Sequence, residues 1–159
     1  MSALQKSNMA VQRALEAAGV QSEIQTLPSS TRTAKAAAES LGCGVAQIAK
    51  SIVFKASDSG QAVLVVASGV NRIDEAAVAE LLGEPIERAT PEFVREKTGF
   101  AIGGVAPCGH AEPVTVLIDE DLLDLAECWA AAGTPHSVFR LEPHELAGLT
   151  SGRVAAVKA

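Results

Sequence analysis

Lys50 is the first residue of this chain whose type and position could support chemistry. It lies in the run Gln47-Ile-Ala-Lys50-Ser-Ile-Val-Phe, where a short helical turn is expected to pass into an apolar strand. A lysine at the start of a buried strand lies at the rim of a sheet, where its ammonium can reach a pocket and burial can shift its pKa. Position alone favours the plainer interpretation, a side chain that extends past the rim into water.

A glycine-rich loop is the second candidate. Gly103 and Gly104 are adjacent, and Pro107 follows three residues later. Adjacent glycines allow main-chain N–H groups to approach a ligand closely, and such groups can stabilise a developing oxyanion. The alternative is an ordinary loop between a helix and a strand.

A second glycine turn contains Gly133, Thr134 and His136. It is a candidate pocket wall in which Thr134 or His136 offers a hydrogen bond, although it also fits a plain turn into a strand. Three arginines, Arg32, Arg72 and Arg140, are scattered along the sequence, and each is most simply a solvated charge.

Cysteine and histidine give weaker signals. The chain has three cysteines without C-x-x-C spacing, which favours reduced thiols over a disulfide framework or a four-cysteine zinc site. Cys108-x-His110 supplies two metal ligands at most, so no metal is expected. A Cys108 nucleophile with His110 or His136 as its base is an alternative that the sequence leaves open.

Composition limits the classes of function. The chain has 159 residues, 48% of them hydrophobic, with a net charge of −6 and only 3% aromatic residues. An acidic chain with so few aromatics is a poor base-stacking platform, so any contact with nucleic acid should be short and local. The N-terminus is polar and the longest apolar run covers only residues 62–67, which favours a cytoplasmic protein without membrane contact.

Hydrophobic periodicity predicts helices that alternate with strands. We expect one α/β domain, mixed α+β, over residues 1–159, with a mixed sheet and a monomeric state. The expected helices cover residues 7–18, 33–41, 74–82, 90–99 and 143–149. The expected strands cover residues 20–27, 51–55, 61–68, 114–118, 138–141 and 154–157, whereas the pattern of residues 126–132 fits either type.

These motifs together resemble a known family. The run 33–38, the Lys50-Ser51 strand, the Gly103-Gly104-x-x-Pro107 loop, the Gly133 turn and Leu141-x-Pro143-x-x-Leu146 occur in the order and spacing of the YbaK/EbsC family. Its members are free-standing relatives of the editing domain inserted in bacterial prolyl-tRNA synthetases. The resemblance covers nearly the whole chain.

The resemblance implies a compact domain whose central mixed sheet is barrel-like and flanked by helices. It also implies a trans-editing deacylase that hydrolyses the ester of a mischarged tRNA, with the tRNA end and a synthetase as partners. Lys50 would be needed for activity, and the Gly103-Gly104-x-x-Pro107 loop would line the aminoacyl pocket. Water or a group of the substrate would attack, without a cofactor, metal or protein nucleophile.

One stretch departs from the family. Members that act on cysteinyl-tRNA carry Lys-Arg-Gly-Leu-Asp after the glycine turn, whereas this chain has Thr134-Pro135-His136-Ser137-Val138. Alanine, cysteine, serine and threonine therefore remain open as the amino acid removed, with tRNA-Pro or another tRNA as carrier. Two alternatives stay open as well: a module that binds a tRNA end or a synthetase without turnover, and a Cys108-dependent hydrolase.

Overall fold

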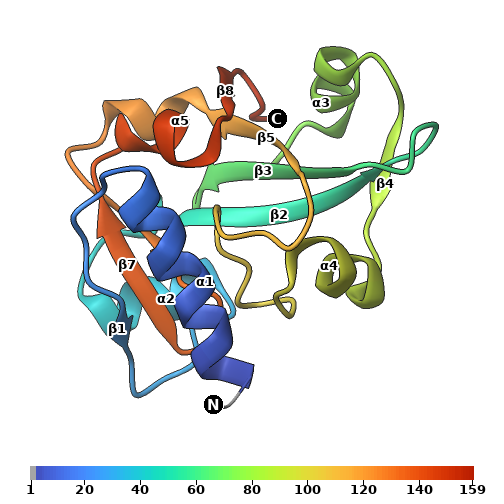
Figure 1. Cartoon of the computed structure of the whole chain (residues 1–159). Coiled ribbons are helices and arrows are strands. Elements are labelled where there is room, and N and C mark those ends of the chain that lie inside the picture. The colour runs from blue at the N-terminus through green and yellow to red at the C-terminus, as the bar shows by residue number, and fades with distance from the viewer. Residues whose placement is uncertain (1–2) are drawn as a thin grey trace.

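The computed structural model describes residues 3–159, and Figure 1 shows how the elements are arranged. The helices are α1 (Ala3–Ala17), α2 (Ala34–Leu41), α3 (Glu75–Leu82), α4 (Pro91–Thr98) and α5 (Glu145–Thr150), with the short 3-10 turns η1 (Val45–Gln47) and η2 (Glu120–Asp124). The strands are β1 (Gln25–Thr26), β2 (Ala49–Ala56), β3 (Ala62–Ser68), β4 (Ile86–Arg88), β5 (Thr115–Asp119), β6 (Cys128–Ala131), β7 (Ser137–Leu141) and β8 (Arg153–Ala155). No helix within residues 3–159 is long and apolar enough to cross a membrane.

Helix ends follow the capping signals of the sequence. The Thr33 hydroxyl accepts a hydrogen bond from the Ala36 N–H at the start of α2, which ends at Gly42 with a left-handed φ of 72°. Thr90 caps α4 in the same way, with Pro91 as the first helical residue. These local signals therefore define both helices, as the sequence predicted.

The strands form two sheets. The larger sheet has the order β4-β2-β3-β5-β8, in which β2, β3 and β4 pair antiparallel while β3, β5 and β8 pair parallel. The smaller sheet, β1-β7-β6, is antiparallel. The mixed α/β fold is thus confirmed. The barrel-like arrangement needs a correction, because the strands of residues 3–159 form two open sheets and no closed barrel.

Some expected elements differ in extent. The strand expected over residues 20–27 is reduced to Gln25–Thr26, and both of its residues are exposed, so little burial supports a longer strand. The ambiguous residues 126–132 contain strand β6, whose side chains alternate in burial. The three-residue strand β4 was not expected, since its pattern is too short to detect.

Strand β3 is buried on both faces because a hydrophobic core lies on each side of the larger sheet. Leu64 and Val66 face the core that contains Leu15 of α1 and Val94 of α4. Their neighbour Val65 faces the second core, which includes Val78 of α3. Figure 1 shows α3 and α4 on opposite sides of β2 and β3.

Leu64 is fully buried at the centre of β3, so its truncation tests this arrangement. Leu64→Ala should lower the free energy of unfolding by about 2–5 kcal/mol, because it removes buried apolar contacts and leaves a cavity. Leu123→Ala, at a side chain that is 45% exposed, should cost less than about 0.5 kcal/mol. Urea denaturation followed by circular dichroism measures both. Equal losses in the two variants would contradict the central place of β3.

Candidate functional site

The candidate site lies along the unpaired edge of β2. On one side β2 pairs with β3 from Ala49 to Lys55. On the other side β4 pairs only with the end of β2, from Phe54 to Ala56, and β6 reaches it through the single bridge Ile48↔Trp129. On this side, no strand of the described chain pairs with β2 between these two contacts. The two sheets therefore leave a gap beside residues 49–53.

Strand register determines which main-chain groups face this gap. The Ala56 N–H donates to the Gln61 carbonyl, and the Ile48 carbonyl accepts from the Gly69 N–H, so the even-numbered residues of β2 bond toward β3. In an antiparallel ladder alternate residues bond to opposite sides. Ser51 therefore directs its N–H and C=O groups toward the open edge. These groups offer main-chain donors and acceptors to a ligand.

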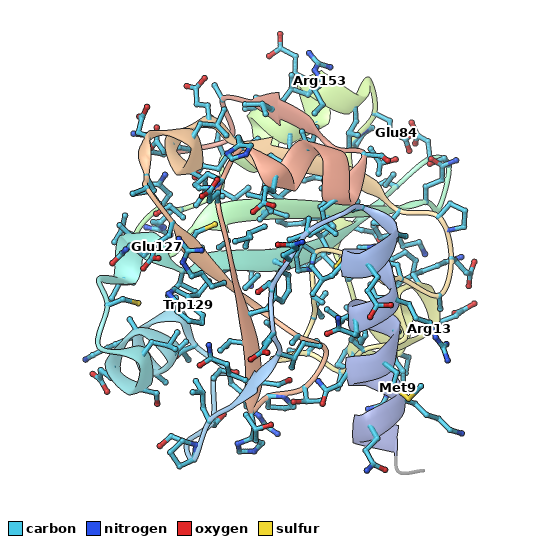
Figure 2. All side chains as sticks on the ribbon, turned by 60° about the vertical axis from the view of Figure 1, so that its left-hand side comes forward. Met9, Arg13, Glu84, Glu127, Trp129 and Arg153 are labelled. Atoms are coloured by element: carbon cyan, nitrogen blue, oxygen red, sulfur yellow. The ribbon has the colours of Figure 1, made fainter. Side chains whose placement is uncertain are left out.

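A cavity of about 800 Å³ follows this edge. Apolar side chains from several elements form much of its wall: Val53, Val94, Val105, Ala130 and Trp129. Figure 2 shows Trp129, which packs against the buried alanines of α2. The Ser51 hydroxyl oxygen also belongs to a lining residue, and it is buried without a hydrogen-bond partner in the described structure. A mostly apolar cavity with a few polar groups is typical of a small-molecule site.

The charges around the cavity oppose the charge of the whole chain. Its described lining includes one carboxylate, Glu75, and five cations: Arg32, Lys35, Lys50, Arg72 and Arg88. The chain as a whole carries a net charge of −6. Two of the three arginines that the sequence left scattered thus meet at one site, whereas Arg140 pairs with Glu127 instead. This local surplus of positive charge favours an anionic ligand.

Lys50 is held at the cavity by a main-chain contact. Its Nζ lies 3.4 Å from the Gly69 carbonyl oxygen, to which it donates. Burial lowers the pKa of Lys50 from its ordinary value, and the negative charge of Asp119 opposes that shift. This contact keeps the ammonium at the cavity, unlike a lysine that extends freely into water.

The glycine pair allows a close approach between two segments. Gly103 lines the cavity with φ +92°, and a β-carbon there would lie 2.8 Å from the Arg32 side chain. A β-carbon on Gly104 would lie 2.6 Å from the backbone of Thr134. The Gly104 N–H already donates to the Ala101 carbonyl at 3.0 Å, so this donor serves the turn itself. Pro107 is buried beyond the lining residues.

The Gly133 turn packs against the Gly103-Gly104 loop and lies outside the cavity lining. The hydroxyl groups of Thr134 and Ser137 lie 2.6 Å apart, and Asn8 of α1 donates to Ser137 at 2.9 Å. Gly133 packs closely against Phe100, and His136 is exposed. Lys50 and Gly103 therefore meet at the cavity, whereas Gly133, Thr134 and His136 are outside its lining.

Cys108 lies in a different environment. Its side chain is buried in the larger core, and desolvation raises the pKa of the thiol to about 12. Nε2 of His110 lies 2.8 Å from the Ala106 carbonyl oxygen. At neutral pH the thiol is protonated and therefore a poor nucleophile. Among the described residues no group of three histidines, cysteines or carboxylates could hold a metal ion.

Sequence reasoning missed three residues of this site. Trp129 stands in the segment of ambiguous pattern, and Ser51 was treated only as the neighbour of Lys50. Asp119 is a carboxylate at the end of a buried strand, a position that signals a functional or structural polar group. All three depend on which strands become neighbours, and local pattern does not determine that.

Comparisons with known proteins identify the family and the fold. Residues 28–149 match the family described as the aminoacyl-tRNA editing domain. The uncharacterized protein YwhH of Bacillus subtilis is 31% identical over 134 residues, which are 84% of this chain and 85% of YwhH. The proline--tRNA ligase of Limosilactobacillus fermentum is 38% identical over 94 residues, which are 57% of this chain but 16% of the ligase.

A solved structure extends the similarity over nearly all of the chain. It is the crystal structure of a proposed trans-editing enzyme for prolyl tRNA synthetase, and it is 50% identical with a TM-score of 0.89. The match covers 96% of this chain and 97% of that one. This chain belongs to the aminoacyl-tRNA editing domain family, as the match over residues 28–149 shows.

Proposed function

We propose that this protein is a deacylase that hydrolyses the ester bond between a small amino acid and the 3′ end of a mischarged tRNA. The observation that carries the proposal is the meeting of the Lys50 ammonium with the open main-chain edge at Ser51 in one cationic cavity. The similarity to the proposed trans-editing enzyme for prolyl tRNA synthetase supports editing in trans, on a tRNA already released from its synthetase.

The cavity suits the end of a tRNA better than its helical body. Positive charges such as Arg32, Arg72 and Arg88 would bind the phosphate beside the terminal adenosine. The rest of the chain is acidic, so a long contact with the tRNA backbone is unfavourable. Recognition would therefore be short, and a synthetase partner could supply further affinity.

The chemistry requires little beyond positioning and charge. A water molecule attacks the ester carbonyl, and the oxygen becomes negatively charged in the tetrahedral intermediate. The Lys50 ammonium and the Ser51 N–H would stabilise that charge. The intermediate then breaks the bond to the ribose oxygen, which takes up the proton released by the water. The products are a free amino acid and an uncharged tRNA, with no covalent intermediate on the protein.

The substrate is a tRNA that carries a small residue, and tRNA-Pro is the first carrier to test. Two of the similar proteins are a proline--tRNA ligase and a proposed trans-editing enzyme for prolyl tRNA synthetase. The apolar wall near Ser51 is built from small and branched residues such as Ala130 and Val105. Alanine, serine, threonine and cysteine match this wall in size.

Lys50→Ala tests the proposed mechanism. It should lower kcat/KM by about 100-fold or more, because one preorganised charge at a developing oxyanion contributes that much. Lys55→Ala is the matched control, since Lys55 stands on the same strand with its ammonium 5.7 Å from the Phe93 ring. Release of labelled amino acid from alanyl-, seryl-, threonyl- and cysteinyl-tRNA-Pro measures both variants. Wild-type rates in Lys50→Ala would contradict the mechanism.

Trp129 provides a readout of binding that does not need turnover. It is the only tryptophan of the chain and lines the cavity, so its fluorescence should change when a ligand enters. A 3′-alanylamino-adenosine 5′-phosphate, whose amide resists hydrolysis, should change the emission in a saturable manner, whereas adenosine 5′-phosphate should bind more weakly. Saturable binding without deacylation of any substrate in the panel would favour a module that binds without catalysis.

Cys108→Ala separates the proposal from a cysteine-dependent hydrolase. Because the thiol is buried and its pKa is raised to about 12, its removal should change kcat by less than about threefold. The measurement is the same deacylation assay, with thermal denaturation to confirm that the variant folds. Loss of activity in a folded Cys108→Ala protein would instead support thiol chemistry.

A further inference from the structure

Asp119 is a buried carboxylate that is hydrogen-bonded to the turn that Lys50 contacts. It is the last residue of β5 and has no exposed surface. Its Oδ2 accepts hydrogen bonds from the Ser68 N–H at 3.1 Å and from the Asn71 side chain at 2.8 Å. Its Oδ1 accepts from the Asp121 N–H at 3.0 Å. A buried charge needs such partners, so this carboxylate occupies a built site.

Strand register places Asp119 in one row with Lys50. Lys50 pairs with Ala67 on β3, and the parallel pair Val66↔Ile118 puts Ala67 beside Asp119. Residues of one row point to the same face. Neighbouring strands lie about 4.8 Å apart, so the two spacings across β3 place the backbones of Lys50 and Asp119 about 10 Å apart.

Asp119 also holds the turn that contacts Lys50. This turn covers residues 68–71, and its first and last residues both donate to the carboxylate. The Asn71 N–H donates to the Ser68 carbonyl at 2.9 Å, which closes the turn. The Gly69 carbonyl within it accepts from the Lys50 ammonium. Any movement of the turn would therefore move the acceptor of Lys50.

We propose that Asp119 is a positioning residue for Lys50, because its buried carboxylate fixes the 68–71 turn and faces the ammonium along one row of the sheet. Its effect on catalysis rests on the proposed deacylase function. Its effect on the position and pKa of Lys50 does not depend on that function, so the positioning role and the deacylase function can be tested separately.

Several charges surround this pair. Asp119 raises the pKa of Lys50, while burial lowers it more strongly. Asp121 accepts from Asn71 and pairs with Lys158 at 3.1 Å, so its charge is partly balanced. The other charged residues that line the cavity are Arg32, Lys35, Arg72, Glu75 and Arg88. Removal of the Asp119 charge should therefore lower the pKa of Lys50 further.

The first measurement is the titration of Lys50 itself. The rate at which an amine-specific acylating reagent modifies Lys50, followed by mass spectrometry over pH, gives its titration midpoint. In Asp119→Asn this midpoint should move to lower pH, since an attracting charge is lost. Asp124→Asn is the matched control, because it removes the same charge from an exposed position on η2. A wild-type midpoint in Asp119→Asn, or an equal shift in Asp124→Asn, would overturn the proposal.

The second measurement is deacylation. Asp119→Asn should lower kcat about tenfold and shift the alkaline limb of the pH–rate profile to lower pH, because an active ammonium is lost above its pKa. Asn71→Ala keeps both charges but loosens the turn, so kcat should fall while the Lys50 midpoint stays unchanged. It also carries the test if thermal denaturation shows that Asp119→Asn is unfolded.

Wild-type kcat in both variants would overturn the positioning role. If the wild-type protein deacylates none of the substrates, the proposed function fails, and the Lys50 titration still decides the relation between Asp119 and Lys50.

Discussion

The unpaired edge of β2 is the constraint on which the site depends. A strand with neighbours on both sides would satisfy its main chain and close the sheets toward a barrel. Here β4 pairs only with one end of β2, and β6 pairs only with Ile48, the residue before its other end, so the middle of the strand borders a cavity. The gap that keeps the two sheets from closing is thus also the place where main-chain groups, apolar walls and cations meet.

The cavity is positively charged, whereas the chain as a whole is negatively charged. An acidic chain gathers five cations around one cavity, and beneath it a fully buried carboxylate is satisfied by three hydrogen bonds. The arrangement confines attraction to a short anionic ligand, because the acidic remainder discourages extended contact. A small domain with few aromatic residues could hold the proposed tRNA end in this way without an extended stacking surface.

The sequence allowed much of the fold to be predicted, and the reasons are local. Capping residues such as Thr33 and Thr90, and the apolar runs of β2 and β3, act through neighbours in the chain. Strand β4 and the short extent of β1 could not be predicted, since both depend on distant partners. Of the site, Lys50 and Gly103 were identified by motif, whereas Trp129, the arginines and Asp119 required the neighbours of each strand to be known.

The sequence by itself determined the elements, the family and the residue types available for chemistry, because periodicity, capping and motif spacing are properties of the linear chain. Only the tertiary structure decided that Lys50 lines a cavity instead of extending into water, and that the backbone of Thr134 packs against Gly104. It also placed Asp119 in the row of Lys50. Strand order and register decide such contacts, and they are set by the packing of segments far apart in sequence.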